Sequence, residues 1–503
     1  MVNSKSVFIV LILTIIFYSY TSAQKIVNIR DFGATGKGLE DETQYLQKAI
    51  DEAAKFPGSI VFLPKGIYLL KSFTITNNYL ENYILRLADN ITIKGEGQNS
   101  VIKLANHLFD KRDINANAHV FYGLNLKNVR LDNFLIDMNG RNNLVPKGTL
   151  KNYSSIFSKR GNNLIIENIV IKNSAGRTMI NIMGAGKNLH INNNNFINGG
   201  PYVGNQTLNP NQNDFSFLYS EWDSTTISNN IICQDNVKAA LTNYNGGIEI
   251  HGSNSLVNNN HITGCWPGLY ITSSMSNTLE NVAVVNNVFN DCAVGISFWI
   301  IQPMENIRIQ YNKIGLRNPT QNDHQLVTGI LIPNGNSTEY SISFANASFN
   351  SHLFIDSNYI FAKEMKNPSQ GISVHSVHNS VISNNLISGM NYAGISIAGS
   401  IWGIDSLKIK KNTFSGFLPN NHKSLVGGFF VITDTYSKTQ KKAKGFKNIE
   451  ISDNRAINNL NFLNSKTNVY NGFIALPQKL MNQVIRKNND FGNTKDFHTV
   501  ITD

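Results

Sequence analysis

Residues Gly246–Ile262 read GGIEIHGSNSLVNNNHI, and this stretch holds two patterns that recur along the chain. From Gly247 onward, apolar and polar residues alternate as Gly-Ile-Glu-Ile-His, which is typical of a half-buried strand. Because side chains alternate across a strand, Glu249 and His251 are expected together on the face away from the core. Residues 257–262, VNNNHI, then form a second short apolar stretch interrupted by asparagine.

The asparagine pattern (apolar, any, any, Asn, any, apolar) repeats, with shortest steps of 25 to 30 residues between asparagines. Its asparagines are Asn194, Asn230, Asn260, Asn287, Asn312, Asn358, Asn385, Asn412, Asn454 and Asn488. The longer steps indicate inserted loops. Asparagines that stack at one turn can form a hydrogen-bonded ladder, which would satisfy backbone groups that a buried turn leaves open.

The glycine-led pattern recurs between the asparagines, beginning at Gly247, Gly268, Gly295, Gly329, Gly371, Gly394 and Gly428. One such unit cannot bury its apolar face alone, whereas units stacked about 4.8 Å apart form parallel sheets along a solenoid. We therefore predict an all-β fold, a single-stranded parallel β-helix. A leucine-rich repeat would need a leucine consensus, and a propeller would need antiparallel blades of roughly 40 residues.

The first 23 residues, MVNSKSVFIVLILTIIFYSYTSA, combine a basic start, an apolar run and a small-residue end. This pattern predicts a secretory signal peptide cleaved after Ala23, and hence a secreted or periplasmic protein. No other apolar run is long enough to span a bilayer, so no membrane association is expected after cleavage. We predict one β-helix domain over residues 24–503, with an N-terminal cap at about 27–70 and coils at about 71–490.

The chain is basic, with a formal charge of +11 and a pI near 9.3, although only 15% of its residues are charged. Such a surface suits polyanions, including an acidic polysaccharide. No nucleic-acid motif is present, so nucleic acid is not expected as a partner. The three cysteines, Cys233, Cys265 and Cys292, lack zinc-site spacing. Cys265 and Cys292 are expected as stacked neighbours, as buried thiols in preference to a disulfide.

The segment before the coils predicts a helix that covers the open end of the solenoid. Asp41-Glu-Thr-Gln44 has the form of a helix start with a capping box. Four apolar residues then lie on one helical face: Leu46, Ala49, Ile50 and Ala53. Pro57-Gly58 ends the helix, and residues 59–63 return as a strand. Without such a cover, the N-terminal end of the solenoid would expose unpaired strand edges and its core.

This segment resembles the opening of the pectate lyase superfamily, through Asp31-Phe-Gly-Ala34, the acidic helix start, and Leu63-Pro-Lys-Gly-Ile-Tyr68. The resemblance is specific over about forty residues, and the coil pattern extends it along most of the chain. It implies a right-handed helix in a family that is mostly extracellular and mostly acts on polysaccharides. Its members include polygalacturonases and related glycosidases, lyases, mannuronan epimerases and phage tail depolymerases.

The catalytic motifs of that superfamily do not carry over. The polygalacturonase signature Asn-Thr-Asp, Asp-Asp, Gly-His-Gly and Arg-Ile-Lys is not met, since the chain has neither Asp-Asp nor Gly-His-Gly. The Tyr/Asp/His cluster of the epimerases is not found either. The fold is therefore better specified than the reaction, and candidate residues must come from the coils themselves.

Equivalent positions of stacked coils form columns, and these predict one outward patch over three adjacent coils. Glu249, His251 and Tyr270 supply groups that transfer protons, and Trp299 supplies a ring on which a sugar can lie. We take these first three as catalytic candidates and Trp299 as substrate-binding. A solvated sheet face without chemistry is the simpler alternative.

Two insertions are expected to wall this patch. The first, residues 201–224, would supply Asp223 as a further catalytic carboxyl. Five other residues are candidates for substrate binding. Asp214, Glu221 and Trp222 lie in the same insertion, and Arg317 lies in the second. His375 occupies the position equivalent to His251 in a later coil, in what we call the histidine column. The second insertion, residues 315–325, also carries His324.

Three functions remain open at this point. A glycoside hydrolase would pair Glu249 with Asp223, Glu221 or Asp214. A polysaccharide lyase would use His251 or Tyr270 to abstract a proton beside a uronate carboxylate. A binding or tail-type β-helix would have no catalytic site. The sequence indicates no cofactor and no metal site, leaving open a calcium ion, and it specifies neither the sugar nor the oligomeric state.

Overall fold

The computed structural model describes the following residues: 24–78, 81–109, 118–143, 153–174, 176, 178–199, 215–234, 245–273, 278–300, 302–318, 326–333, 350–363, 365–399, 403–418, 427–433, 446–457, 471–475, 478–491 and 498–499. The predicted signal peptide, Asp214 and His324 lie outside them. Within these ranges, no helix has both the length and the apolar character needed to cross a membrane.

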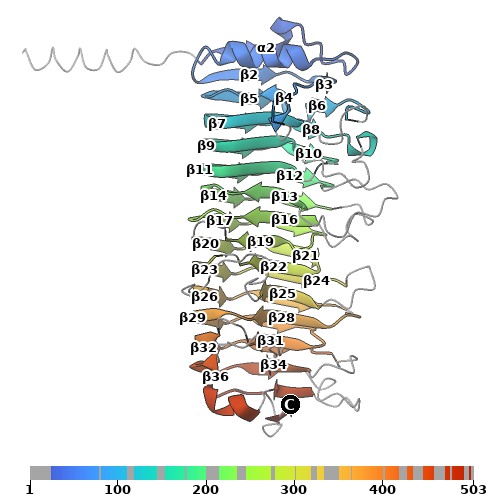
Figure 1. The fold of residues 1–503 in the computed structure, drawn as a ribbon. Helices are drawn as coiled ribbons and strands as arrows, with labels where there is room; N and C mark the ends of the chain where they lie inside the picture. Colours follow the sequence, from blue (N-terminus) through green and yellow to red (C-terminus); the bar gives the residue numbers. More distant parts are fainter. Residues whose placement is uncertain are drawn as a thin grey trace, which may run out of the picture.

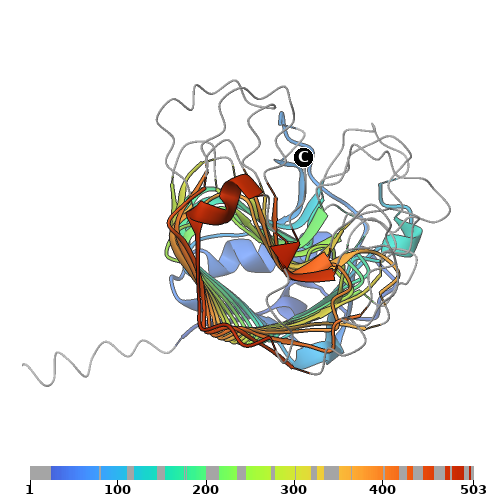
Figure 2. The ribbon, with the colours of Figure 1, turned by 90° about the horizontal axis from the view of Figure 1, so that it is seen from below.

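The strands stack coil upon coil along one axis, and their pairings are parallel throughout the two sheets (Figure 1). One coil runs through β16 (Asn245–Ile250), β17 (Leu256–Asn258) and β18 (His261–Thr263), and β19 (Leu269–Thr272) begins the next. β16 and β17 belong to a 27-stranded sheet and β18 to a 13-stranded sheet. Seen along the axis, the coils superimpose around a common interior (Figure 2). The predicted right-handed parallel β-helix is thereby confirmed.

Three columns of strands build the coils. The glycine-led column contains β13 (Phe215–Ser220), β16, β19, β22 (Val294–Trp299), β25 (Val327–Ile332), β28 (Ser369–Val374), β31 (Ala393–Ala398) and β34 (Gly427–Thr433). The second contains β14 (Asp223–Ser228), β17, β20 (Leu279–Val285), β23 (Met304–Gln310), β26 (Ser351–Asp356), β29 (Val377–Ser383), β32 (Ile404–Lys410), β35 (Phe446–Lys447) and β36 (Ile449–Ser452). The third contains β12 (Asn195–Ile197), β15 (Ile231–Cys233), β18, β21 (Val288–Cys292), β24 (Lys313–Leu316), β27 (Tyr359–Ala362), β30 (Leu386–Ser388), β33 (Thr413–Ser415) and β37 (Arg455–Ile457).

Three strands of 12 to 14 residues occur in the N-terminal part of the stack, before the coils of the three columns. The N-terminal elements are β1 (Ile26–Asn28), η1 (Ile29–Phe32), α2 (Thr43–Ala53), β2 (Ser59–Leu63), β3 (Gly66–Leu70), β4 (Tyr83–Arg86), β5 (Ile91–Gly95), η3 (Gly97–Asn99), β6 (Ser100–Leu104), β7 (His119–Asp132), β8 (Leu135–Asp137), η4 (Gly140–Asn142), β9 (Ile156–Glu167), β10 (Val170–Lys172) and β11 (Ile180–Asn192). The C-terminal elements are β38 (Asn471–Ala475), η6 (Gln478–Gln483), β39 (Val484–Lys487) and β40 (His498–Thr499).

The helix α2 lies across the N-terminal end of the stack, as predicted (Figure 1). Its apolar face is buried and includes the four predicted residues. The start differs in detail from a capping box, because the helix begins at Thr43 and Asp41 Oδ1 accepts hydrogen bonds from the Thr43 backbone N (3.1 Å) and hydroxyl (2.6 Å). The same Asp41 oxygen accepts from Lys71 N at 3.0 Å, which ties the cap to the first coil.

The asparagine ladder is present and buried. Asn287 Nδ2 donates to Asn312 Oδ1 at 3.0 Å and to Val257 O at 2.9 Å, and Asn287 N donates to the same Asn312 oxygen at 2.9 Å. Asn260 donates in turn to Asn287 Oδ1. The Asn287 side chain therefore satisfies backbone groups of the preceding coil, and its own backbone N–H is satisfied by the asparagine of the next coil.

The predicted last member of the ladder is wrong by one residue. Asn454 donates to Asn489 Oδ1, whereas Asn488 takes a left-handed turn conformation with φ of 51°. The register explains the shift: Ile451 pairs with Arg486, so the apolar Ile485 is displaced outward and is 49% exposed. Apolar periodicity alone aligned Ile485 with the interior and so selected the wrong asparagine.

None of the three cysteines, all of them in the described residues, forms a disulfide, and Cys265 and Cys292 are fully buried, as favoured from the sequence. Thr263 pairs with Asn290, and Cys265 and Cys292 each follow two residues later, which agrees with their predicted stacking. Burial raises the pKa of Cys265 well above its ordinary value and that of Cys292 to about 12. Both thiols are therefore protonated and unreactive near neutral pH.

Candidate functional site

The outward column predicted around Glu249 is confirmed by the strand register. Glu249 pairs with Tyr219 of β13 on one side and with Tyr270 of β19 on the other, and Tyr270 pairs with Ser297. The two tyrosines therefore flank Glu249 at the coil spacing of about 4.8 Å. Further along the column, Ser396 pairs with Val431 in β34. The glycine pattern, counted from Gly428, predicts Phe430 at this position, so it is wrong by one residue there.

Glu249 and His251 form a recessed pair. Glu249 Oε1 lies 3.0 Å from His251 Nε2, and Glu249 Oε2 accepts a hydrogen bond from the Ser216 hydroxyl at 2.9 Å. Each of the two side chains is only 12% exposed, which argues against a merely solvated face. Since a carboxylate can only accept, Nε2 carries the proton in this bond and Nδ1 remains the nitrogen able to accept one.

Glu221 provides a second carboxylate beside this pair. Glu221 Oε1 accepts from the Tyr219 hydroxyl at 2.6 Å, and its other oxygen accepts from Gly184 N. The pairing of Ser220 with Ile250 places Glu221 alongside His251 in the neighbouring strand. The Tyr219 and His251 rings also touch, with centroids 4.7 Å apart.

Strand spacing gives the separation of the two glutamates. They are diagonal neighbours, one strand and two residues apart, so their Cα atoms lie about 8 Å from each other. Both carboxylates are held by two donors. The site thus combines two oriented carboxyls, an imidazole and two phenols on one sheet face.

Tyr270 and Trp299 complete this face. Burial, followed by the charge of Glu249, raises the pKa of Tyr270 well above its ordinary value, so its phenol stays protonated and can donate a hydrogen bond. Trp299 pairs with Thr272 and is 43% exposed, so its ring is available to a ligand. We define the Glu249 site as Tyr219, Glu221, Glu249, His251 and Tyr270.

The prediction for Trp222 is wrong. This side chain has no exposed surface, and its Nε1 donates to Met183 O at 3.4 Å. Gly161 and Gly186 lie against the indole, where any Cβ would collide with it. Residues 215–224 are not an insertion: they form β13 and the corner into β14, so Trp222 turns inward as a core residue.

Asp223 lies at that corner, away from the Glu249–His251 hydrogen bond. It is exposed, and its Oδ1 accepts from Ser253 N at 2.8 Å. Ser253 is two residues beyond His251, so Asp223 is on the rim of the sheet face. Of the two predicted second carboxyls that the structure describes, Glu221 is the one bonded within the site.

Neither His375 nor Arg317 joins the Glu249 site. His375 is in the histidine column but four strand steps away, through β19, β22, β25 and β28. It lies 3.1 Å from the Ser373 hydroxyl, and burial lowers its pKa. Arg317 follows β24 in the other sheet and donates its backbone N–H to Cys292 O, so the expectation that it flanks the patch is wrong.

A second polar group on the same face was not predicted. The Tyr122 hydroxyl donates to Glu81 Oε2 at 3.0 Å, and Lys159 Nζ lies 3.0 Å from Glu81 Oε1. Burial, then the hydrogen bond to Glu81, raises the pKa of Tyr122 to about 12. Tyr122 stacks on Phe157 with centroids 5.7 Å apart. These coils precede the first ladder asparagine, so the repeat did not reveal their columns.

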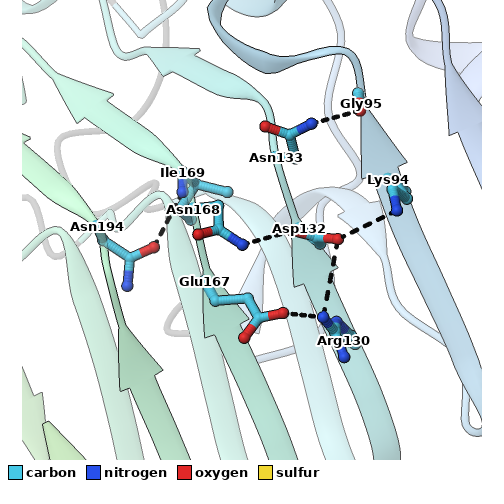
Figure 3. Close-up of polar contacts among 9 residues, drawn as sticks. All are labelled: Lys94, Gly95, Arg130, Asp132, Asn133, Glu167, Asn168, Ile169 and Asn194. Carbon is cyan, nitrogen blue, oxygen red and sulfur yellow. Dashed lines mark hydrogen bonds and ion pairs between the residues drawn. The ribbon is translucent and has the colours of Figure 1, made fainter. Parts of the chain in front are cut away.

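A charged cluster on β5, β7 and β9 was also missed from the sequence (Figure 3). Asp132, itself 5% exposed, lies 3.7 Å from Lys94 Nζ and 3.9 Å from Arg130 Nη2, and Arg130 also pairs with Glu167. Two cations thus balance two carboxylates, which is the composition of a structural ion-pair network. Next to it, Asn194 Oδ1 accepts from Ile169 N, where the ladder begins.

No group of three or more histidine, cysteine or acidic side chains suited to a metal ion occurs in the part of the chain that the structure describes.

Comparison with known proteins agrees with this architecture. A family model described as rhamnogalacturonase A/epimerase, pectate lyase-like, matches residues 26–220, which cover the cap and the first coils. The tailspike protein of E. coli bacteriophage HK620, solved with a pentasaccharide, superimposes with a TM-score of 0.58 over 93% of this chain and 79% of that one, at 16% identity. The family match thus concerns the N-terminal part of the chain, and the tailspike shares its β-helix fold.

Other proteins similar to this chain carry different names. Plasmin and fibronectin-binding protein A of Streptococcus pneumoniae is 31% identical over 182 residues, which are 34% of this chain and 24% of that protein. A mannuronan C5-epimerase of Azotobacter vinelandii is 30% identical over 152 residues, 30% of this chain and 17% of the epimerase. The crystal structure of the streptococcal adhesin PfbA matches with a TM-score of 0.58 over 84% of this chain and 94% of that one, at 17% identity.

The chain thus spans about a quarter or less of the length of these curated relatives. The structural matches, at identities of 16% and 17%, show the fold alone. Enzymes that act on polysaccharides and an adhesin both occur among the relatives, so the superfamily leaves the reaction open.

Proposed function

We propose that this protein binds a polysaccharide along the outward face of its glycine-led strands and hydrolyses a glycosidic bond with Glu221 and Glu249. The observation that carries the proposal is the pair of carboxyls on adjacent coils, each held by two hydrogen-bond donors, with Glu249 flanked by Tyr219 and Tyr270. Glycoside hydrolysis needs two carboxyl groups that flank the scissile bond.

The geometry suits the division of labour in that reaction. One carboxylic acid protonates the leaving oxygen, while the other carboxylate acts on the anomeric carbon directly or through water. The protonated Tyr270 phenol can donate to an oxygen of the bound sugar. The exposed Trp299, two coils from His251 in the same column, offers a ring face to a neighbouring sugar.

Other features support a polysaccharide as the ligand. One relative of the chain is called an alginate lyase, with 38% identity over 78 residues (15% of this chain and 9% of that protein), and the HK620 tailspike holds a pentasaccharide. The formal charge of +11 favours an acidic polymer. The signal-like first 23 residues support export to the place where such polymers occur.

A lyase is the second candidate, because of the Glu249–His251 hydrogen bond. It orients the imidazole with Nδ1 as proton acceptor, as general-base catalysis requires. In β-elimination, the base removes the proton beside a uronate carboxylate, the glycosidic C–O bond breaks, and the sugar gains a C=C bond. The protonated Tyr270 could then donate to the leaving oxygen.

The test is a polysaccharide panel followed by substitution. The parent is expected to release new reducing ends without the ultraviolet absorbance of an unsaturated product. Glu249→Gln and Glu221→Gln should each lower the rate about 10²–10⁴-fold, and circular dichroism checks that both variants keep the parental fold. Glu280→Gln, an exposed glutamate on β20, is the matched control and should keep the parental rate.

The other outcomes separate the alternatives. If ultraviolet absorbance rises with each cleavage and His251→Ala is inactive, the protein is a lyase. If both glutamate variants cleave at the parental rate, the Glu249 site is not catalytic. Binding of a polymer without any cleavage would identify a binding protein.

A further inference from the structure

A cavity of about 420 Å³ lies outside the Glu249 site, at the ends of strands of the 13-stranded sheet. Its lining includes Asn290 and Asp291 from β21, Arg317 and Asn318 after β24, and the pair Phe361 and Lys363 at the end of β27. With Thr263 of β18, four successive coils therefore contribute to one hollow. The turns that follow these strands lead back to the glycine-led column, so the cavity lies around a corner from that face.

One wall of the cavity is an aromatic ring fixed on the sheet. Phe361 pairs with Gly315, and a Cβ at Gly315 would lie only 2.7 Å from the Phe361 ring. The glycine thus lets the ring lie down on the neighbouring strand. Tyr359 stacks on Phe361 with centroids 5.0 Å apart, and Lys313 Nζ lies 5.7 Å from the ring centroid. Such a ring presents a flat apolar surface at a rigid position.

The polar part of the lining is cationic. Among the described residues of the lining, Arg317 and Lys363 supply two positive charges and Asp291 supplies one carboxylate. Arg317 is half-buried and its backbone is anchored to Cys292 O at 3.1 Å. Asn318 Oδ1 accepts from Lys366 N at 2.7 Å and from Asn367 N at 3.2 Å, which joins two sides of the cavity. Hydrogen bonds therefore fix the backbone of Arg317 and the side chain of Asn318 at the cavity.

We propose that this cavity is a second carbohydrate-binding site, specific for a sugar that carries a carboxylate, such as a uronic acid residue of an acidic polysaccharide. The sugar ring would lie on Phe361, and Arg317 and Lys363 would bind its carboxylate through charge-assisted hydrogen bonds. Asp291 and Asn290 would accept and donate hydrogen bonds to its hydroxyl groups. The site is separate from the Glu249 site and stands whether or not the protein cleaves its ligand.

Calorimetry with defined probes tests this proposal on the full chain. The probes are trimers of galacturonate, glucuronate and mannuronate, with maltotriose as the neutral sugar and inorganic phosphate as the anion without a ring. A Glu249→Gln background prevents turnover during the titration. At least one uronate trimer is expected to bind, and maltotriose and phosphate are expected to bind at least tenfold more weakly.

Substitutions then locate the binding. Lys363→Ala and Phe361→Ala should each weaken the trimer's binding to this site at least tenfold. Lys408→Ala, an exposed lysine on β32, is the matched control and should leave it within twofold. The proposal is overturned if no uronate trimer binds, if phosphate binds as tightly as the trimer, or if the two pocket variants bind like the parent. Cleavage is not measured in these titrations, so failure of the hydrolase proposal would be seen separately.

Discussion

At the scale of single residues, the fold depends on asparagines that perform a task no apolar side chain can. Asn287 has no exposed surface, and its amide group joins the turns of adjacent coils. An amide supplies both a donor and an acceptor, so one residue type can repeat indefinitely along the stack. This repetition of chemistry is what makes the ladder visible in the sequence.

Replacing Asn287 with Ala should lower the free energy of unfolding by about 1–3 kcal/mol, because buried partners on both sides lose their hydrogen bonds. Asn489→Ala is the matched comparison. It accepts from Asn454 and donates to Ile451 O, but it is the last member of the described ladder. It should therefore cost less. Urea denaturation of both variants provides the measurement, and equal losses would contradict the ladder as a stabilising device.

At the scale of elements, strands of the glycine-led column could be predicted where they have both the initial glycine and the alternation of apolar and polar residues. A strand of that column without the glycine could not. β16 and β19 have the glycine and the alternation, and the structure places both as expected. β13 begins Phe215-Ser-Phe with no glycine at its start, so it was interpreted as part of an insertion. Because of that error, Trp222 was predicted at the surface and the hydrogen bond between Tyr219 and Glu221 was not predicted.

The cavity at Arg317 shows a different limit of sequence analysis. Its lining comes from residues far apart in the chain, and only the stacking register brings Asp291, Arg317 and Lys363 together. Each of them alone is an ordinary surface residue. The register is set by hydrogen bonds between coils, and the inserted loops of these coils differ in length. The periodicity of the sequence therefore does not specify the register.

The N-terminal cap gives a prediction at the same scale. Glu42 is 1% exposed, and its Oε1 accepts from Thr35 N (2.8 Å), the Thr35 hydroxyl (2.7 Å) and Gly36 N (2.9 Å). Glu42→Ala should leave these donors unpaired and destabilise the protein by about 1–3 kcal/mol or more. Glu40→Ala, at an exposed neighbouring position, should change stability by less than about 0.5 kcal/mol. Thermal unfolding compares them, and similar melting temperatures for both would show that Glu42 does not anchor the cap.

At the scale of the whole molecule, the solenoid is a one-dimensional stack in which each coil contacts only its neighbours. Stability in such a protein is a sum over coils and their interfaces, so the two ends determine where opening begins. The N-terminal end is closed by α2, whose apolar face packs on the first coils (Figure 1). Toward the C-terminus, β39 pairs with β36 out of apolar register, leaving Ile485 49% exposed.

Hydrogen exchange should therefore reveal an asymmetric gradient. Amides of β16, β19 and β22 should be the most protected, because opening them requires the separation of coils on both sides. Protection should fall through β34 and β36 to β39, whereas β2 and β5 should stay protected beneath α2. Mass spectrometry of exchanged peptides measures this order directly. Glu42→Ala should selectively accelerate exchange in β2 and β5 and leave β39 unchanged. Uniform protection from β2 to β39, or faster exchange at the N-terminal end of the parent, would show that the helix does not set the stability of the stack.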